Sequence, residues 1–342
     1  MDRPPLRTVA ALAQVSEPTV SRVLNGRTGV SDALRARVVT ALSELGYHDV
    51  PEPTVQRRGV VGIVCGDLLN PVFPTMLHHI SAALGRRGYL TSVAIVDEHL
   101  NSEERCLREL RANGVDGVVL IGGRHAEVGV DVETYRRLID NDLAVVLVNG
   151  TETSLPVPHV RCDEGLGAAK AVDHLLGLGH QRVGCVLGSH RFIPSHRMQS
   201  SYRMALTEAG IEPDPNDVIV SSSFTFEEAR AAAFRLIDRG VTGILAGNDL
   251  MALGVLRAGL DLGRSVPGEL SVVGYDGTGI TGLTKPALTT LRQPFEEMGN
   301  LIADAIRSET EGRGFRDSFV FEPHLVARES SGPFQSSARP AR

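Results

Sequence analysis

The chain has 342 residues, of which 42% are apolar and 22% charged. This composition is typical of soluble globular proteins, and the length suits two or three domains. The formal net charge of −6 argues against a uniformly basic nucleic-acid-binding chain or a polybasic membrane anchor. The longest apolar run, Leu143–Val148, is far shorter than the ~18–20 residues that span a bilayer, and the N-terminus lacks the apolar segment of a signal peptide. We therefore expect a cytoplasmic protein that does not bind membranes.

The charge is distributed unevenly along the chain. Residues 1–58 contain eight arginines and six acidic residues, a net charge of +2, so the remainder carries −8. A small basic module attached to a larger acidic body indicates that the module meets a polyanion.

Residues 1–46 carry the pattern of three short helices. The first has apolar residues at helical spacing in TVAALA, and a turn follows at Val15-Ser16. Ser16 is suited to cap the second helix, and Pro18 falls in the first turn of that helix, where a missing N–H costs little. The third helix begins near Ser31 and ends at Gly46, a glycine suited to the position after a helix. The residues expected between the helices are Val9, Leu12, Ala13, Val20, Val23, Leu24, Leu34, Val38, Leu42 and Leu45.

Two short helices across a tight turn with a supporting third helix form either a helix-turn-helix or a small structural cap. The segments TVSRVLNG and GVSDALRARVVTALSELGY favour the first. They closely resemble the DNA-binding headpiece of the LacI/GalR family of bacterial transcriptional regulators, without a gap from Thr8 to Tyr47. The resemblance implies that the second helix enters the major groove of DNA.

The resemblance also implies which residues contact DNA. Glu17, Pro18 and Arg22 occupy base-reading positions. Arg22 can bind guanine O6 and N7 together, and Glu17 can accept from cytosine N4, whereas Pro18 can only pack, for example on a thymine methyl group. Further contacts, mainly to the DNA backbone, are expected from Thr8, Ser16, Thr19, Ser21 and Asn25.

The linker, residues 47–58, departs from the family pattern. In that pattern x-Pro-Asn-x-x-Ala-x-x-Leu folds into a hinge helix that inserts its leucine into the minor groove. Here Asp49-Val50 replaces Pro-Asn, Pro53 replaces the alanine, and Gln56 stands at the leucine position, with Val55 the nearest apolar side chain. We expect Val55 and Gln56 at the minor groove, and a poorly helical linker that inserts there less than in the family.

From residue 59, short β-branched runs alternate with helical stretches. This alternation predicts an α/β core with parallel sheets and helices on both faces, and its length suits two lobes. The expected strands are Val60–Val64, Leu90–Val96, Gly117–Ile121, Ala144–Val148, Arg182–Leu187, Gly243–Ala246 and Leu270–Gly274. The expected helices are Phe73–Arg87, Ser102–Asn113, Glu164–Gly179, Arg197–Ala209, Glu227–Arg239 and Leu250–Leu262.

The resemblance to the family continues more loosely to Ser330, through NPVF, RCDEGLGA, AGNDLMALG, VPGELSVVGYD and TTLRQP. It implies a two-lobed, periplasmic-binding-protein-like core, residues 59–330, with three chain crossings and a ligand in the cleft. By the family pattern, the first lobe is about 59–160 plus 293–322, and the second is about 161–292 plus the C-terminal end. Residues 331–342 have no periodicity, so we expect a disordered tail.

Ligands of such sheets lie at the carboxyl ends of the strands. Carried over from the family, Asp276 and Asn248 bind the effector, and the rings of Phe73 and Phe224 either pack against it or belong to the core. The family's ligand-binding arginine falls at Met198 here, so its neighbour Arg197 is the candidate. The full set of expected effector-binding residues is Asn70, Phe73, Arg124, Asn149, Arg197, Phe224, Asn248 and Asp276. By contrast, Asp163 and Asp249 are expected to cap helices.

Catalytic patterns are weak. GTGITG, residues 277–282, follows a strand, but Pro286 interrupts the helix that a dinucleotide site requires. The four cysteines, Cys65, Cys106, Cys162 and Cys185, lie far apart and indicate buried apolar residues, and the histidines show no metal-ligand spacing. We expect no enzyme, no cofactor and no metal.

The sequence thus predicts a transcriptional regulator, most readily a repressor, that binds palindromic operator DNA. We expect a homodimer, with a tetramer possible, because one headpiece reads half of a palindrome. A small polar, sugar-like metabolite would control it. A solute-binding protein of a transport system uses the same core but predicts a signal peptide and no helix-turn-helix. An enzyme using the cleft predicts a nucleophile–base pair or a cofactor loop.

Overall fold

The computed structural model describes residues 5–25, 29–46, 58–96, 102–131, 133–139, 143–150, 155–315 and 317–335. The chain forms two compact units, residues 1–58 and 59–342. The first contains α1 (Leu6–Ala13), α2 (Glu17–Leu24) and α3 (Asp32–Glu44).

The three helices of the first unit surround one small core. Its buried residues are Val9, Ala10, Ala13, Val20, Val23, Leu24, Val38, Ala41 and Leu42. The prediction was wrong for Leu12 and Leu45, which are 47% and 37% exposed. The buried face of α1 runs through Val9, Ala10 and Ala13, so Leu12 lies beyond its edge, and Leu45 follows the last helical residue of α3.

The ends of these helices are held by local polar contacts. The Ser31 hydroxyl accepts from the Leu34 N–H, and Gly46 has a φ of 77°, which confirms both predicted ends of α3. Ser16 precedes α2, but its hydroxyl bonds to Thr19 Oγ1 at 2.8 Å instead of capping the backbone.

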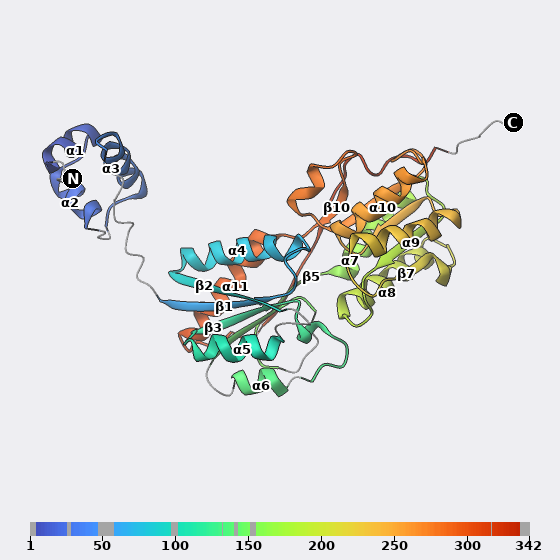
Figure 1. The fold of residues 1–342 in the computed structure, drawn as a ribbon, viewed down its shortest axis with the longest axis horizontal. Coiled ribbons are helices and arrows are strands. Elements are labelled where there is room, and N and C mark those ends of the chain that lie inside the picture. The colour runs from blue at the N-terminus through green and yellow to red at the C-terminus, as the bar shows by residue number, and fades with distance from the viewer. Residues whose placement is uncertain are drawn as a thin grey trace. The chain divides into compact units, whose positions relative to one another are not determined.

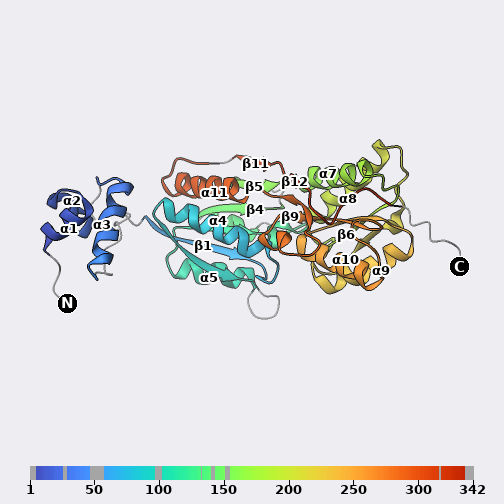
Figure 2. The same cartoon turned by 90° about the horizontal axis from the view of Figure 1, so that it is seen from above.

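The second unit contains two six-stranded sheets. The first, in the order β11-β5-β4-β3-β1-β2, is entirely parallel. Figures 1 and 2 show α4 and α11 on one face of this sheet and α5 on the other, with α6 beside α5 in Figure 1. The strands are β1 (Gly59–Cys65), β2 (Tyr89–Ile95), β3 (Gly117–Ile121), β4 (Ala144–Val148), β5 (His159–Cys162) and β11 (Ser318–Phe321). The helices are α4 (Val72–Arg86), α5 (Glu103–Ala112), α6 (Glu133–Ile139), α11 (Phe295–Thr310) and the short 3₁₀ helix η1 (Arg124–Ala126).

The second sheet has the order β12-β10-β9-β8-β6-β7, with only β12 antiparallel to its neighbour. Helices α7 and α8 cover one face, and α9 and α10 cover the other (Figure 2). The strands are β6 (Val183–Leu187), β7 (Val218–Val220), β8 (Gly243–Ala246), β9 (Ser271–Asp276), β10 (Thr289–Arg292) and β12 (His324–Val326). The helices are α7 (Glu164–Gly177), α8 (Ile193–Glu208), α9 (Phe226–Asp238), α10 (Asp249–Asp261) and the 3₁₀ helices η2 (Pro215–Asp217) and η3 (Gly279–Gly282).

The predicted fold class is confirmed, but several short elements were missed. Strands β5, β7, β10, β11 and β12 have three or four residues each, too few for their apolar pattern to stand out. The prediction also omitted α6 and α11, and it began α8 at Arg197, whereas the helix begins at Ile193.

The chain crosses between the two lobes three times. It leaves the first lobe after β5, returns after β10, and leaves again after β11. Strand β5 therefore points toward the second lobe and β10 toward the first. Because their neighbours β4 and β9 are parallel to them, the carboxyl edges of the two sheets face each other.

The predicted disordered tail is wrong for residues 331–335, which pack against the second lobe. The Phe334 N–H donates to the Leu178 carbonyl and the Gln335 N–H to the Gly268 carbonyl, each at 2.9 Å, and the Phe334 ring lies 5.5 Å from that of His180. The sequence did not reveal these contacts, because backbone hydrogen bonds and a single ring contact leave no periodic pattern. Residues 336–342 lie outside the described part of the chain.

In the described residues, no helix combines the length and the hydrophobicity that crossing a bilayer demands.

Packing between α9 and α10 depends on a glycine. A Cβ at Gly254 would lie 2.3 Å from the Phe226 carbonyl oxygen and 3.0 Å from the Arg230 nitrogen, both backbone atoms.

We predict that Gly254→Ala lowers the free energy of unfolding by ~1–3 kcal/mol, because the helices must separate. Gly177→Ala is the control, since a Cβ at this helical position meets nothing within 4 Å. It should raise stability by ~0.5–1 kcal/mol. Urea unfolding of both variants checks this, and a neutral Gly254→Ala contradicts the close approach.

Candidate DNA interface and ligand site

Helix α2 separates an apolar face from an exposed polar face. Val20, Val23 and Leu24 are buried, while Glu17, Pro18 and Arg22 are exposed. Glu17 and Pro18 form the first turn of α2, and Arg22 follows one turn later. The three base-reading candidates are therefore accessible near the N-terminal end of α2. In a recognition helix this end lies at the base edges of the major groove.

The other headpiece candidates surround this face. Thr8 is exposed on α1, and Thr19 and Ser21 are half-buried on α2. The Asn25 amide nitrogen donates to the Ser21 carbonyl at 2.7 Å, so this side chain folds back onto the end of α2. Val55 and Gln56 lie outside the described residues, and their assignment to the minor groove stays a prediction.

In the first lobe, the Phe73 ring covers the ends of two strands. A Cβ at Gly66, after β1, or at Gly122, after β3, would lie 3.2 and 3.3 Å from the ring. Asn70 precedes α4, and its side-chain oxygen, Oδ1, accepts from the Val72 N–H at 3.4 Å. Asn149 follows β4 with a left-handed φ of 63°. Phe73, Asn70 and Asn149 thus lie at the carboxyl edge, and the half-buried Phe73 ring packs against the core of the first lobe.

Arg124 begins the loop after β3, and a buried carboxylate holds this loop. Glu103 is 4% exposed; its Oε2 accepts from the Arg124 N–H at 2.8 Å, and its Oε1 accepts from the Tyr135 hydroxyl. Burial, followed by the Glu103 charge, raises the pKa of Tyr135. The backbone of Arg124 is therefore fixed while its side chain is exposed.

In the second lobe, aromatic rings cover the end of β6. The Phe224 ring lies so close to Gly188 that a Cβ there would be 2.1 Å away, so this position requires glycine. The Phe192 ring lies 5.8 Å from Phe224, between ring centroids. Phe192 was not among the predicted effector-binding residues, because it precedes the expected start of α8.

Asn248 both caps a helix and presents an unused donor. Its side-chain oxygen, Oδ1, accepts from the Met251 N–H at 2.7 Å, at the start of α10. The residue is 3% exposed, and its amide nitrogen has no hydrogen-bond partner among the described residues. A buried donor without a partner is costly, and this nitrogen retains the capacity to donate one hydrogen bond.

Asp249 does not cap the helix that it opens, contrary to the prediction. Its carboxylate accepts from the Thr278 N–H at 2.7 Å and from the hydroxyls of Thr278 and Thr290 at 2.8 and 2.6 Å. Burial raises the pKa of Asp249 to about 6. Asp249 thus ties α10 to the segments after β9 and within β10. Asp163 does cap its helix, accepting from the Leu166 N–H.

Asp276 ends β9 in a strained and buried position. Its φ is 111°, a left-handed value unusual for a non-glycine residue, and it is 5% exposed. Gln293 Nε2 donates to Asp276 Oδ1 at 2.7 Å. Burial, then the charge of Asp249, raises the pKa of Asp276 well above its usual range. Gln293, which follows the strand β10 missed from sequence, leaves its own buried Oε1 without a partner among the described residues.

Arg197 lies beside a buried glutamate at the first lobe crossing. Its Nη1 lies 3.5 Å from Glu164 Oε2, and Arg161 Nη1 lies 3.3 Å from the same oxygen. Glu164 is 4% exposed, and burial raises its pKa. Neither Arg161 nor Glu164 was selected from the sequence.

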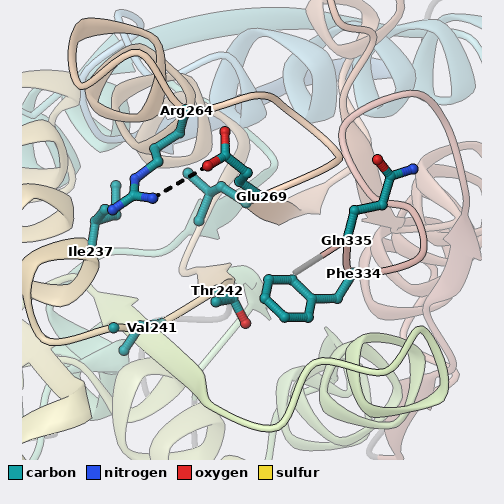
Figure 3. Close-up of a pocket in the computed structure, with 9 residues that line it drawn as sticks. Ile237, Val241, Thr242, Arg264, Glu269, Phe334 and Gln335 are labelled. Atoms are coloured by element: carbon teal, nitrogen blue, oxygen red, sulfur yellow. Dashed lines mark hydrogen bonds and ion pairs between the residues drawn. The ribbon is translucent and has the colours of Figure 1, made fainter. Parts of the chain in front are cut away.

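A separate cavity of about 120 Å³ lies at the opposite edge of the second sheet. Its lining includes Thr242, before β8, and Leu270, before β9, and Phe334 contributes a wall (Figure 3). Arg264 and Glu269 form an ion pair at its rim, 3.4 Å apart. None of the predicted effector-binding residues lines this cavity, which is at the amino ends of the strands.

The four cysteines are buried and unpaired, as expected. Across the described ranges, no cluster of three His, Cys, Asp or Glu side chains could hold a metal ion.

A helix-turn-helix unit joined to a two-lobed α/β unit defines a DNA-binding protein with an effector-binding type of core. Residues 5–49 match the model of bacterial regulatory proteins of the lacI family, and residues 172–331 match that of the periplasmic binding protein-like domain. The chain belongs to the LacI family and is a DNA-binding transcriptional regulator.

The similarity to individual relatives extends over nearly the whole chain. The transcriptional regulator MalR of Streptomyces coelicolor is 36% identical, over 95% of this chain and 96% of its own length. The transcriptional repressor CytR of Escherichia coli is 32% identical, with 95% and 96% covered. The solved complex of the transcriptional regulator CelR with cellobiose is 30% identical, with a TM-score of 0.72, over 96% of this chain and 100% of that one.

Arg22 offers a test of the DNA interface. We predict that Arg22→Ala lowers operator affinity by ~1–3 kcal/mol and flattens the base preference at one symmetric pair of positions. Arg136→Ala, which removes an exposed arginine from α6, should leave the selected sequence unchanged. Selection of bound sequences from a random DNA pool measures both, and an unaltered preference in Arg22→Ala overturns the assignment.

The buried carboxyls offer a test by pH. Because the pKa of Asp276 is raised in the folded state, its contribution to stability is full at low pH and falls as pH rises through the folded value. Asp276→Asn retains an acceptor for Gln293 and cannot ionise. We predict that it is more stable than wild type at pH 8, on the order of 1–2 kcal/mol, and equal to it near pH 4. Urea unfolding across this range checks the sign, and parallel pH profiles contradict it.

Proposed function

We propose that the chain is a transcriptional repressor whose binding to a palindromic operator is controlled by a small polar, sugar-like metabolite. The ligand binds between the carboxyl edges of the two lobes. Residues 1–46 bind DNA, and residues 59–330 bind the ligand and dimerise. Residues 47–58 link these two parts of the chain. The protein acts in the cytoplasm, where its operator is, and performs no catalytic step.

The observation that carries this proposal is two buried polar atoms that have no hydrogen-bond partner among the described residues. Asn248 Nδ2 is an unused donor and Gln293 Oε1 an unused acceptor, both among residues that follow parallel strands. A hydroxyl group both donates and accepts, so a polyol offers partners for both kinds of atom. Asp276, held by Gln293, supplies further acceptor capacity.

The aromatic side chains suit the same ligand class. Phe73 in one lobe, and Phe224 with Phe192 in the other, present ring surface at the two facing edges. Sugar rings carry apolar C–H faces that pack on such rings while their hydroxyls bond to polar groups. The CelR relative was solved with cellobiose, which supports a saccharide for this chain.

Dimerisation follows from the operator symmetry, because each headpiece reads one half-site. Strand β2 is an edge strand of the first sheet, and it exposes Leu90, Val93 and Ile95. An exposed apolar sheet edge is suited to association with a second copy. In the dimer, a ligand that favours one lobe arrangement changes the spacing of the two headpieces and so the operator affinity.

The test separates ligand response from DNA binding. We predict that Asp276→Asn binds operator with near wild-type affinity but requires about 30-fold more saccharide for the same response. Gln293 occupies one side-chain oxygen of Asp276, and the substitution turns the other into an NH₂ group that cannot accept from ligand donors. The measurement is operator binding by fluorescence anisotropy, with cellobiose and a panel of mono- and disaccharides. Gln335→Ala, on the opposite edge of the sheet, is the control and should respond as wild type does.

Two outcomes contradict the proposal. An Asp276→Asn protein that responds at the wild-type saccharide concentration places the ligand elsewhere. A wild-type protein that binds no operator, with or without saccharide, removes the repressor function itself. A wild type that binds operator only with saccharide makes the ligand a corepressor, and one that releases operator with saccharide makes it an inducer; both results agree with the proposal.

A further inference from the structure

Two loops from different lobes make direct contact through their backbones. The loop after β3 includes Glu127 and Val128, and the loop before α8 includes Arg191 and Phe192. The Val128 N–H donates to the Arg191 carbonyl at 2.9 Å, and Glu127 pairs with Phe192 in an isolated antiparallel bridge. The lobes are therefore joined here by a non-covalent contact in addition to the chain crossings.

An ion pair reinforces this backbone contact. Arg191 Nη2 lies 2.7 Å from Glu127 Oε1. The Glu127 side chain is 16% exposed and that of Arg191 50%, so one partner is largely removed from water. A partly desolvated ion pair with a direct hydrogen bond is stronger than a pair in open solvent.

The loop from the first lobe is rigidly anchored. Besides the Glu103 contacts to Arg124 and Tyr135, His125 is fully buried, and its Nε2 lies 3.0 Å from the Val148 carbonyl oxygen. Ala126 lies against Gly150, where a Cβ would be 2.3 Å from the alanine Cβ. Because its base is fixed to β4 and α5, this loop carries Glu127 as part of the first lobe rather than as a free segment.

The loop from the second lobe connects the ion pair to the proposed ligand site. The Arg191 guanidinium carbon lies 5.7 Å from the centroid of the Phe192 ring, and this ring packs against Phe224 at 5.8 Å. A change at Arg191 therefore reaches two aromatic rings at the carboxyl edge of the second sheet.

We propose that Glu127 and Arg191 form an interlobe latch that favours the closed arrangement of the two lobes. The latch is made of the ion pair and the backbone bridge beside it. When it opens, the lobes separate more readily and Phe192 loses its covering cation. The part of this inference that concerns ligand response rests on the proposed function, whereas the lobe arrangement can be measured without ligand or DNA.

Distance measurement between spin labels tests the latch on the full chain. The four native cysteines are buried, so labels attach selectively to Arg108→Cys on α5 and Met204→Cys on α8, two exposed positions in different lobes. Labelled chains are mixed with an excess of unlabelled chains, so that only distances within one chain are measured. The latch variants are Glu127→Gln, Glu127→Arg, Arg191→Glu and the charge-swapped double variant.

We predict that Glu127→Arg and Arg191→Glu each move population to longer, broader distances. The ratio of closed to open chains should fall about three- to tenfold, because attraction is replaced by repulsion. Glu127→Gln should give a smaller fall, and the double variant should restore the wild-type distribution. Glu109→Arg is the matched control, since it breaks the Glu109–Arg105 pair within α5, which joins no lobes.

Three results overturn the latch: distributions unchanged in both charge reversals, failure of the double variant to restore the closed distance, or an equal shift in the Glu109→Arg control. Circular dichroism melting excludes variants that unfold, and Glu127→Gln, which nearly preserves shape, keeps the test valid if a reversal does not fold. Loss of operator binding or of saccharide response would contradict the proposed function and leave these distances unaffected.

Discussion

The parallel pairing of the strands that carry the chain between lobes determines where a ligand can bind. Strand β5 pairs in parallel with β4, and β10 with β9, so each lobe sends its strand ends toward the other. The loops after β1, β3, β4, β6, β8 and β9 must then gather along two facing edges. Strand interiors are buried on both faces and filled with apolar side chains, whereas strand ends leave polar backbone and helix starts exposed. Polar recognition is possible only at those ends.

The facing edges retain features that a purely structural edge would not need. Asp276 and Asn149 adopt left-handed backbone conformations, and Asp276, Asp249 and Glu164 are buried carboxyls with raised pKa values. Such groups cost stability unless the surrounding structure or a ligand compensates them. For Asp249, three donors from Thr278 and Thr290 supply that compensation within the protein. Among the described residues, one side-chain donor, Gln293 Nε2, bonds to Asp276, and the amide nitrogen of Asn248 has no acceptor.

In the headpiece, the residues that pack the core and the candidate base-reading residues are separate. Its core consists of a few small aliphatic residues from three short helices, so packing fixes its shape with little area to spare. Packing does not constrain the predicted base-reading residues. Glu17, Pro18 and Arg22 are exposed and can differ among related proteins without changing the fold. The core unit has the opposite arrangement, since its candidate ligand residues are part of its helix caps and strand ends.

The sequence by itself determined the headpiece helices, the alternating α/β pattern, and most of the residues at strand ends, because periodicity, capping residues and motifs are local. Phe73, Asn149, Asn248 and Asp276 were placed at strand ends in this way, whereas their expected role in binding came from the family resemblance. The tertiary structure alone decided which carboxylates are compensated: Asp249 accepts from residues 29 and 41 positions away, a distance at which no local pattern exists. It likewise brought Glu127 to Arg191, and Gln293 to Asp276, and it ordered residues 331–335. Contacts of this kind depend on how the lobes and sheet edges meet, so only the folded chain, and not the order of its residues, reveals them.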